Sequence, residues 1–224
     1  MKNAQLKVLT QNPYALDEAY KTVRTNLLFS GVNTNVISVT SCDAGDGKST
    51  VSFEISKSLS DINKKVLYID ADMRKSLFAE RFTTETEPIG LSHFLSGQTN
   101  FEETVYSTNK ENLYVIFAGK FPSNPAELLS GDRFPELIKQ ARETFDYIII
   151  DTPPLGLVSD AMLCVAQSDG AVMVISSERT KSKNAKQVKA TIEKTGVRII
   201  GCVLNEVHRG TGKYYHYYKY KKYY

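Results

Sequence analysis

One ten-residue stretch, SCDAGDGKST (41–50), constrains this chain more than any other feature. It follows a β-branched apolar run (36–40) and precedes an amphipathic segment (49–60). Glycines let the backbone N–H groups of such a loop close around phosphate oxygens, and the helix N-terminus adds partial positive charge. A loop that ends in Gly-x-Gly-Lys-Ser/Thr therefore predicts a binding site for a nucleoside triphosphate. The loop departs from the strict pattern at its first position, where Cys42 replaces glycine.

Each polar residue at the end of this loop has an expected contact. Lys48 is expected to reach the β- and γ-phosphates, and the Ser49 hydroxyl to ligate Mg²⁺, while Thr50 contacts the α-phosphate. The alternative is a surface loop that matches by chance, and the position between a strand and a helix makes it the weaker one. The loop residues predicted to contact the nucleotide are Gly45, Asp46, Gly47, Lys48, Ser49 and Thr50.

Carboxylates stand at the ends of two further apolar runs. VLYIDADMR carries Asp70 and Asp72, and YIIIDTPP carries Asp151. A carboxylate at the end of a buried strand is costly unless it is paired or bound to a metal. We therefore expect these three acids and Ser49 to surround Mg²⁺. The alternative is that Asp70 or Asp151 caps a helix or pairs with Arg74.

Short apolar runs alternate with longer amphipathic segments along the whole chain. The runs are almost continuously apolar, as in a parallel sheet that is covered by helices on both faces. This order predicts an α/β fold with a doubly wound, mainly parallel sheet, whose strands meet a ligand at their carboxyl ends. The expected strands are 36–40, 66–70, 113–119, 147–151, 170–176 and 198–205, and the expected helices are 16–29, 49–60, 132–145 and 184–195.

Length, composition and charge exclude several classes of protein. The chain has 224 residues, 42% of them hydrophobic and 24% charged, which suits one globular domain. Residues 1–208 hold 23 basic and 25 acidic side chains, so this part is not a basic nucleic-acid binder. The three cysteines and three histidines are scattered, so we expect neither a disulfide framework nor a transition-metal site. No membrane-spanning or signal segment is found, and a cytoplasmic location is expected.

The C-terminal segment differs from the rest of the chain. Residues 209–224 contain five basic residues and no acidic ones, and seven of the last 11 residues are tyrosine. We expect a disordered tail here, after a globular domain of residues 1–208. It is an inert extension, a stacking surface for single-stranded nucleic acid, or a substrate for phosphorylation, and the tyrosine density favours the last. The tyrosines predicted to be modified are Tyr214, Tyr215, Tyr217, Tyr218, Tyr220, Tyr223 and Tyr224.

Together these motifs resemble those of a known family. The resemblance is to bacterial tyrosine kinases (BY-kinases), whose Walker A, Walker A′ and Walker B motifs are similar to GDGKST, IDADMR and IIIDTPP, respectively. Within that family, the chain most resembles the kinase subunits of capsular polysaccharide systems (CapB/CpsD type) and the Wzc kinase domain. NPAELL (124–129) and EAYKTVRTNLLFS (18–30) also resemble family segments. The wider superfamily of MinD and ParA P-loop ATPases has a signature lysine where Asp43 stands, which favours the kinase branch. Ala44 replaces a proline that is usual in family loops.

The resemblance implies an ATP- and Mg²⁺-dependent protein-tyrosine kinase. It would autophosphorylate its tail in trans between subunits and regulate the synthesis and export of capsular polysaccharide or exopolysaccharide. Lys48 would neutralise charge on the phosphates. Asp70 would orient or deprotonate the phenol of the substrate tyrosine, and Asp72 would organise water around the metal. The roles of Asp70 and Asp72 could be exchanged. Asn205 matches the residue that reads adenine in MinD-like proteins; the alternative is a turn or capping asparagine. The other function considered is a MinD/ParA-like ATPase whose basic tail binds DNA or membrane.

The resemblance also implies partners. Glu18, Lys21 and Arg24 share one face of a predicted helix, which is either an ordinary solvated face or a family motif that docks on a neighbouring subunit and builds a ring. Lys21 replaces an arginine of that motif and cannot form a bidentate ion pair. A transmembrane adaptor would activate the kinase through a cytoplasmic segment and recruit it to the inner face of the membrane. No nucleic-acid partner is expected.

Overall fold

The structure is a computed structural model that describes residues 2–7, 13–31 and 33–207. The predicted tail and all seven of its tyrosines lie outside the described residues. The division of the chain at residues 208 and 209 therefore remains a prediction. Within the described ranges, no helix combines the length and the apolar character that crossing a bilayer requires.

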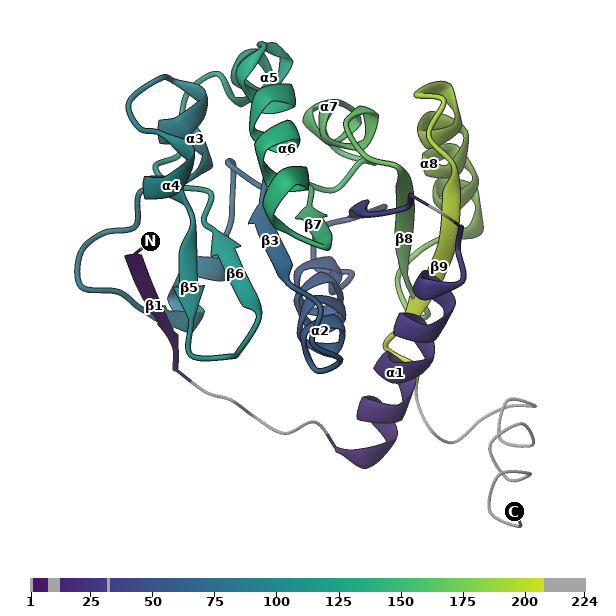
Figure 1. Cartoon of the computed structure of the whole chain (residues 1–224). Helices are drawn as coiled ribbons and strands as arrows, with labels where there is room; N and C mark the ends of the chain where they lie inside the picture. The colour runs from purple at the N-terminus through teal and green to yellow at the C-terminus, as the bar shows by residue number, and fades with distance from the viewer. Residues whose placement is uncertain (1, 8–12, 32, 208–224) are drawn as a thin grey trace.

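A nine-stranded sheet forms the centre of the molecule (Figure 1), with the strands in the order β4-β1-β5-β6-β3-β7-β2-β8-β9. Among the described strands, only the pairs β1–β4 and β5–β6 are antiparallel, so the predicted mainly parallel sheet is confirmed. The strands are β1 (Lys2–Leu6), β2 (Val36–Ser41), β3 (Val66–Asp70), β4 (Phe82–Thr83), β5 (Tyr106–Thr108), β6 (Leu113–Ile116), β7 (Tyr147–Asp151), β8 (Gly170–Ser176) and β9 (Ile199–Asn205).

All six predicted strands are present, and three additional strands lie together on one side of the sheet. β1, β4 and β5 are two to five residues long, and their sequences are largely polar. Such strands carry no local hydrophobic signal because their stability comes from pairing with a neighbour that is distant in sequence. Ala4 of β1, for example, pairs with Thr108 of β5.

The four predicted helices are also present, with ends that differ by at most two residues from those expected. They are α1 (Tyr14–Leu28), α2 (Lys48–Ser60), α6 (Arg133–Thr144) and α8 (Ser182–Lys194). The helices that the sequence did not indicate are four to seven residues long, too short to be stable without tertiary packing. These are the 3₁₀ helix Phe78–Arg81, α3 (Leu91–Leu95), α4 (Phe101–Thr104), α5 (Pro125–Ser130) and α7 (Asp160–Ala166).

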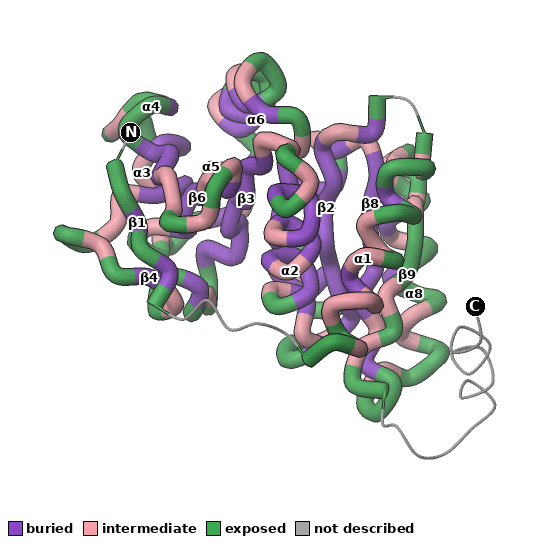
Figure 2. The backbone as a smooth tube through the Cα atoms, turned by 60° about the horizontal axis from the view of Figure 1, so that its bottom comes forward, coloured by how far each residue is buried: buried purple, intermediate pink, exposed green. Residues whose placement is uncertain are grey.

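The helices cover both faces of the sheet. α1 and α2 pack on one face, where alternate strand residues such as Tyr68 and Ile149 point toward them. α3 to α6 pack on the other face against Leu67 and Ile150, and α7 and α8 pack beside them against β8. Figure 2 shows the central strands β2 and β3 as buried, whereas the outer strand β9 consists of intermediate and exposed residues. Burial on both faces explains why the central strands are continuously apolar.

This topology brings the motif loops to one edge. β3, β7 and β2 are consecutive parallel strands, so their carboxyl ends meet. In the register of the sheet, Asp70 at the end of β3 lies opposite Asp151 at the end of β7. The connection from β2 to α2, which contains the phosphate loop, starts beside them. The sheet therefore gathers loops that are up to about a hundred residues apart in the chain.

Candidate active site

The phosphate loop depends on two glycines with left-handed backbone conformations. Gly45 has φ +86° and Gly47 has φ +85°, values that residues with a Cβ atom rarely adopt. α2 begins directly after Gly47, and the N–H groups of Thr50 and Val51 donate to the Gly47 carbonyl oxygen. Inside the loop, the N–H of Asp43 donates to the Asp46 carboxylate over 2.9 Å. The loop therefore opens a helix N-terminus toward the edge of the sheet.

Lys48 lies at the centre of the site. Its Nζ is 3.6 Å from Asp72 Oδ2 and 3.6 Å from Asp151 Oδ1, and it donates to Ser49 Oγ over 3.1 Å. Only 8% of the lysine is exposed. Burial alone would lower the pKa of Lys48, but the attraction of the carboxylates, led by Asp151, outweighs it and raises the pKa. Lys48 is therefore a buried ammonium ion held by carboxylates.

Asp70 has a carboxyl group whose pKa is strongly raised. Burial, and then the negative charge of Asp151, raise the pKa of Asp70 from its usual 3.8 to about 7, although a hydrogen bond from Ser76 and the charge of Lys48 oppose them. One Asp70 oxygen accepts the Ser76 hydroxyl and the other accepts the N–H of Asp72 over 3.3 Å. Near neutral pH this carboxyl group is therefore able both to release and to accept a proton.

Asp151 has one oxygen that is satisfied and one that is not. Oδ2 accepts the Tyr68 hydroxyl over 2.9 Å, whereas the buried Oδ1 has no hydrogen-bond partner among the described residues and lies 3.6 Å from Lys48 Nζ. A buried acceptor without a donor is rare unless a ligand completes it. A Mg²⁺ ion or its bound water fits this oxygen, because Mg²⁺ prefers oxygen ligands and keeps several waters.

The carboxylates near Lys48 do not form a complete set of metal ligands. Among the described residues, no group of three or more His, Cys, Asp or Glu side chains is arranged so that it holds a metal by itself. A Mg²⁺ ion bound by Ser49 and Asp151, with Asp70 and Asp72 nearby, would take its other ligands from phosphate oxygens and water, as is usual at phosphate sites. The predicted set of four metal-binding residues remains a prediction.

Arg74 pairs with a residue that the sequence analysis missed. Its Nε and Nη2 donate to the two oxygens of Asp160 over 2.6 and 3.1 Å, so it neutralises neither Asp70 nor Asp151. Asp160 starts α7 and is almost completely buried. The only local signal was an acidic residue at the start of an apolar segment, and nothing in the sequence linked it to Arg74. The pair fastens the turn after β3 to α7.

Two residues predicted to contact the nucleotide, Thr50 and Asn205, make hydrogen bonds within the protein. The Thr50 hydroxyl accepts a hydrogen bond from Arg81 over 3.2 Å. Asn205 Nδ2 donates to the carbonyl oxygen of Asp46 over 3.0 Å, so this side chain rests on the phosphate loop. The structure thus brings Asn205 to the loop, and its contact with adenine remains a prediction.

Known proteins share this architecture. A family model described as "AAA domain" matches residues 34–199. The tyrosine-protein kinase CpsD of Streptococcus agalactiae is 37% identical over 206 residues, covering 92% of this chain and 90% of that protein. The chain belongs to the bacterial tyrosine-protein kinase family. Among solved structures, the chimerical protein CapA2B2 matches this kinase with a TM-score of 0.85 and 30% identity, over 93% of this chain and 94% of its own.

A more distant similarity connects the kinase to P-loop ATPases. The septum site-determining protein MinD of Pyrococcus horikoshii, solved in complex with Mg-ADP, has a TM-score of 0.67 and 27% identity, over 79% of this chain and 72% of its own. The predicted MinD-like P-loop fold is therefore confirmed.

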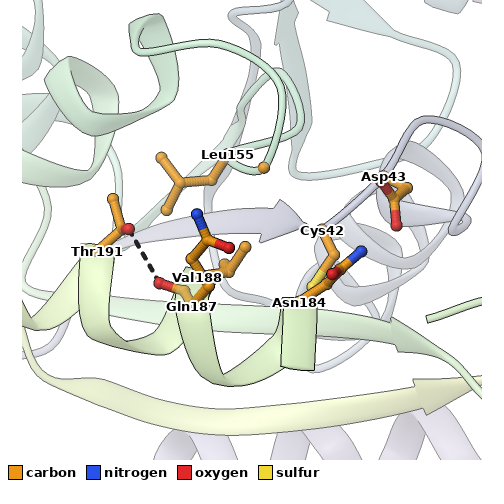
Figure 3. A pocket seen from close by; sticks show the side chains of 8 residues that line it. Cys42, Asp43, Leu155, Asn184, Gln187, Val188 and Thr191 are labelled. Atoms are coloured by element: carbon orange, nitrogen blue, oxygen red, sulfur yellow. Dashed lines mark hydrogen bonds between the residues drawn. The ribbon is translucent and has the colours of Figure 1, made fainter. Parts of the chain in front are cut away.

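The kinase has a cavity of about 150 Å³ beside the start of the phosphate loop (Figure 3). Cys42 and Asp43 border it from the loop, Leu155 from the connection after β7, and α8 forms its other wall. Lys48 and the three carboxylates do not line this cavity. It is therefore next to the phosphate loop but separate from the cluster around Lys48.

The predicted oligomerisation residues lie on α1 and make contacts within the kinase. Lys21 pairs with Asp17 over 2.7 Å and with Glu18 over 3.0 Å, as on a solvated helix face. Arg24 donates to the carbonyl oxygen of Ser58 over 2.8 Å and so fastens α1 to α2. Contact of these residues with a neighbouring subunit remains a prediction.

Proposed function

We propose that this kinase transfers the γ-phosphoryl group of ATP to tyrosines in the C-terminal tail of a neighbouring copy. The observation that carries the proposal is the ammonium group of Lys48, which lies 3.6 Å from both Asp72 and Asp151. It stands at the end of a loop whose glycines have left-handed backbone conformations. A preformed cation beside backbone N–H groups suits phosphoryl transfer, where catalysis is mostly positioning and charge neutralisation.

The protein's own groups supply most of what the reaction needs. Lys48 and the loop N–H groups bind and orient the phosphates, and Ser49 with Asp151 would hold Mg²⁺. When bound, the metal supplies positive charge to the β- and γ-phosphates. Asp72 would fix the water shell of the metal, since its Oδ1 is oriented by the N–H groups of Arg74 and Lys75 over 3.3 and 3.1 Å.

Asp70 is the candidate proton acceptor. A phenol has a pKa of about 10 and stays protonated at neutral pH, so the base takes the proton late in the transfer. With its pKa near 7, Asp70 accepts that proton more readily than an ordinary carboxylate. This favours Asp70 over Asp72 for the role that the sequence left open between them.

The tail suits the role of substrate in length and composition. Sixteen residues from Arg209 span roughly 50 Å when extended, which is enough to reach an adjacent copy. Each phosphotyrosine adds about −1.5 to −2 charges. Modification of several tyrosines would therefore reverse the charge of a tail with five basic residues and release it from an acidic site.

The family also supports a place in polysaccharide production. We propose that copies assemble through α1, with the face of Glu18, Lys21 and Arg24, into a ring that holds each tail beside the next site. A transmembrane adaptor would activate the kinase at the inner face of the membrane and couple it to the synthesis and export of capsular polysaccharide or exopolysaccharide. The location is then cytoplasmic, with peripheral recruitment.

The test is incubation with Mg-ATP, with and without the cytoplasmic segment of the adaptor, followed by mass spectrometry of the C-terminal peptide. We expect phosphotyrosine in the tail, and none in a Lys48→Met variant. Absence of phosphotyrosine under both conditions, together with phosphate release that DNA or lipid stimulates, would instead support a MinD/ParA-like ATPase. That alternative is kept because of the similarity to MinD.

A further inference from the structure

Two side chains from the ends of β8 and β9 hold the phosphate loop from outside. Arg179, in the turn after β8, donates from Nη2 to the carbonyl oxygen of Gly45. Asn205, the last residue of β9, donates from Nδ2 to the carbonyl oxygen of Asp46 over 3.0 Å. Two consecutive carbonyl groups of the loop thus accept hydrogen bonds from residues that follow them by more than a hundred positions.

The left-handed glycines make room for both donors. A Cβ atom on Gly45 would lie 3.0 Å from Nη1 of Arg179, and a Cβ atom on Gly47 would lie 2.1 Å from Nδ2 of Asn205. The two glycines therefore permit the loop conformation and also the close approach of the side chains that hold it. Arg179 therefore contacts the loop by close packing against Gly45 as well as by its hydrogen bond to the Gly45 carbonyl oxygen.

Arg179 is itself held by Glu206. Nη2 of the arginine lies 2.7 and 2.9 Å from the two carboxylate oxygens of Glu206. The same carboxylate accepts the Ser176 hydroxyl, and the carbonyl oxygen of Glu206 accepts the Ser177 hydroxyl over 2.5 Å. The end of β8 and the residue after β9 therefore form one connected unit that presents the guanidinium to the phosphate loop.

Fixing a carbonyl also fixes the N–H group of the same peptide, because the two point in opposite directions across the peptide plane. The peptide that carries the Gly45 carbonyl carries the N–H of Asp46, and N–H groups of such loops bind phosphate. We propose that Arg179, held by Glu206, is a positioning residue that presets the phosphate loop to bind the β-phosphate of the nucleotide. The proposal rests on nucleotide binding at this loop, which is part of the proposed function, but not on transfer to tyrosine.

The first test compares the binding of fluorescently labelled ADP and AMP to the wild type and to Arg179→Ala. We expect the variant to bind ADP about tenfold more weakly, as for loss of a charge-assisted hydrogen bond, and AMP almost as well as the wild type, because AMP lacks the β-phosphate. Unchanged ADP affinity overturns the proposal. An equal loss for both nucleotides also overturns it, since Arg179 would then contact the base or the ribose.

A double-mutant cycle with Glu206→Gln tests the link between the two residues and needs only ADP. Alone, Glu206→Gln should weaken ADP binding by a few-fold, and in the Arg179→Ala background it should have no further effect. Arg179→Lys, which keeps a donor and a charge, should restore part of the affinity. Losses that add in the double variant would show that Glu206 does not act through Arg179.

Thermal unfolding of the nucleotide-free variants separates positioning from general damage. The side chains of Arg179 and Glu206 are 49% and 34% exposed, so the melting temperature should change by no more than about 4 °C. A large decrease in Tm that parallels the lost affinity overturns the positioning role. If the wild type itself binds no ADP, both this proposal and the proposed function fail. If the wild type and all variants bind ADP with the same affinity, only the positioning role is rejected.

Discussion

Replacing Asp70 by asparagine should stabilise the nucleotide-free kinase at high pH. The pKa of Asp70 is raised from 3.8 to about 7, so the folded state holds the proton more tightly than the unfolded state. The contribution of this group to stability is therefore lost as the pH rises from about 4 to about 7. Three pKa units at about 1.4 kcal/mol each give a penalty of up to about 4 kcal/mol, of which roughly 2 to 3 kcal/mol develops between pH 5 and pH 8.

Urea unfolding, followed by circular dichroism in EDTA at pH 5 and pH 8, measures this penalty. We expect the free energy of unfolding of Asp70→Asn, relative to the wild type, to rise by roughly 2 to 3 kcal/mol from pH 5 to pH 8. Asparagine keeps the shape of the side chain but cannot ionise. In Mg-ATP the same variant should lose phosphotyrosine formation, so that stability and activity change in opposite directions.

Asp169→Asn is the matched control because its shift has the opposite sign. Burial opposes ionisation of Asp169, but hydrogen bonds from Arg142 and from the N–H groups of Val36 and Asn35 outweigh it and lower the pKa. The stabilisation that Asp169 provides is present above its unfolded pKa and is lost as the pH falls. Asp169→Asn should therefore be less stable than the wild type at pH 8 and approach it in acid. A stability difference for Asp70→Asn that is the same at both pH values would refute the reasoning.

Three further predictions follow from the geometry of the site. Lys48→Met should destabilise the nucleotide-free kinase by about 3 kcal/mol in urea unfolding, because it leaves Asp151 buried without a cation. Adding Asp151→Asn should restore most of this loss. A double variant no more stable than Lys48→Met contradicts the prediction. Asp160→Asn should lower phosphotyrosine formation at least about tenfold, because Arg74 no longer holds the turn after β3. The free energy of unfolding in urea should fall by only about 1 kcal/mol, since Arg74 is half exposed. Unchanged phosphotyrosine formation rejects this prediction. Deletion of 213–224 should leave the affinity for labelled ADP unchanged, since Arg179 and Asn205, whose side chains hold the phosphate loop, lie outside the deleted segment. A decrease of more than about threefold would refute this.

The sequence by itself determined the central sheet, the long helices and the phosphate loop. β2, β3 and β7 are buried on both faces, so each is an apolar run that can be recognised without knowing its neighbours. Gly45 and Gly47 were predicted as loop glycines because their backbone conformation is a local requirement. The carboxylates Asp70 and Asp151 were found for a related reason, since each ends an apolar strand.

Only the tertiary structure decided which side chains meet. The pairing of Arg74 with Asp160 spans 86 positions and leaves no pattern in the sequence. The sequence left Asn205 open between a contact with adenine and a turn or capping role, and its hydrogen bond to the phosphate loop is known only from the structure. β1 and β5 are strands because they pair with neighbours that are distant in sequence: β1 with β4 and β5, and β5 also with β6. Local periodicity specifies a backbone conformation, but contacts between distant segments depend on how the strands are ordered in the sheet, and that order is fixed by the packing of the whole core.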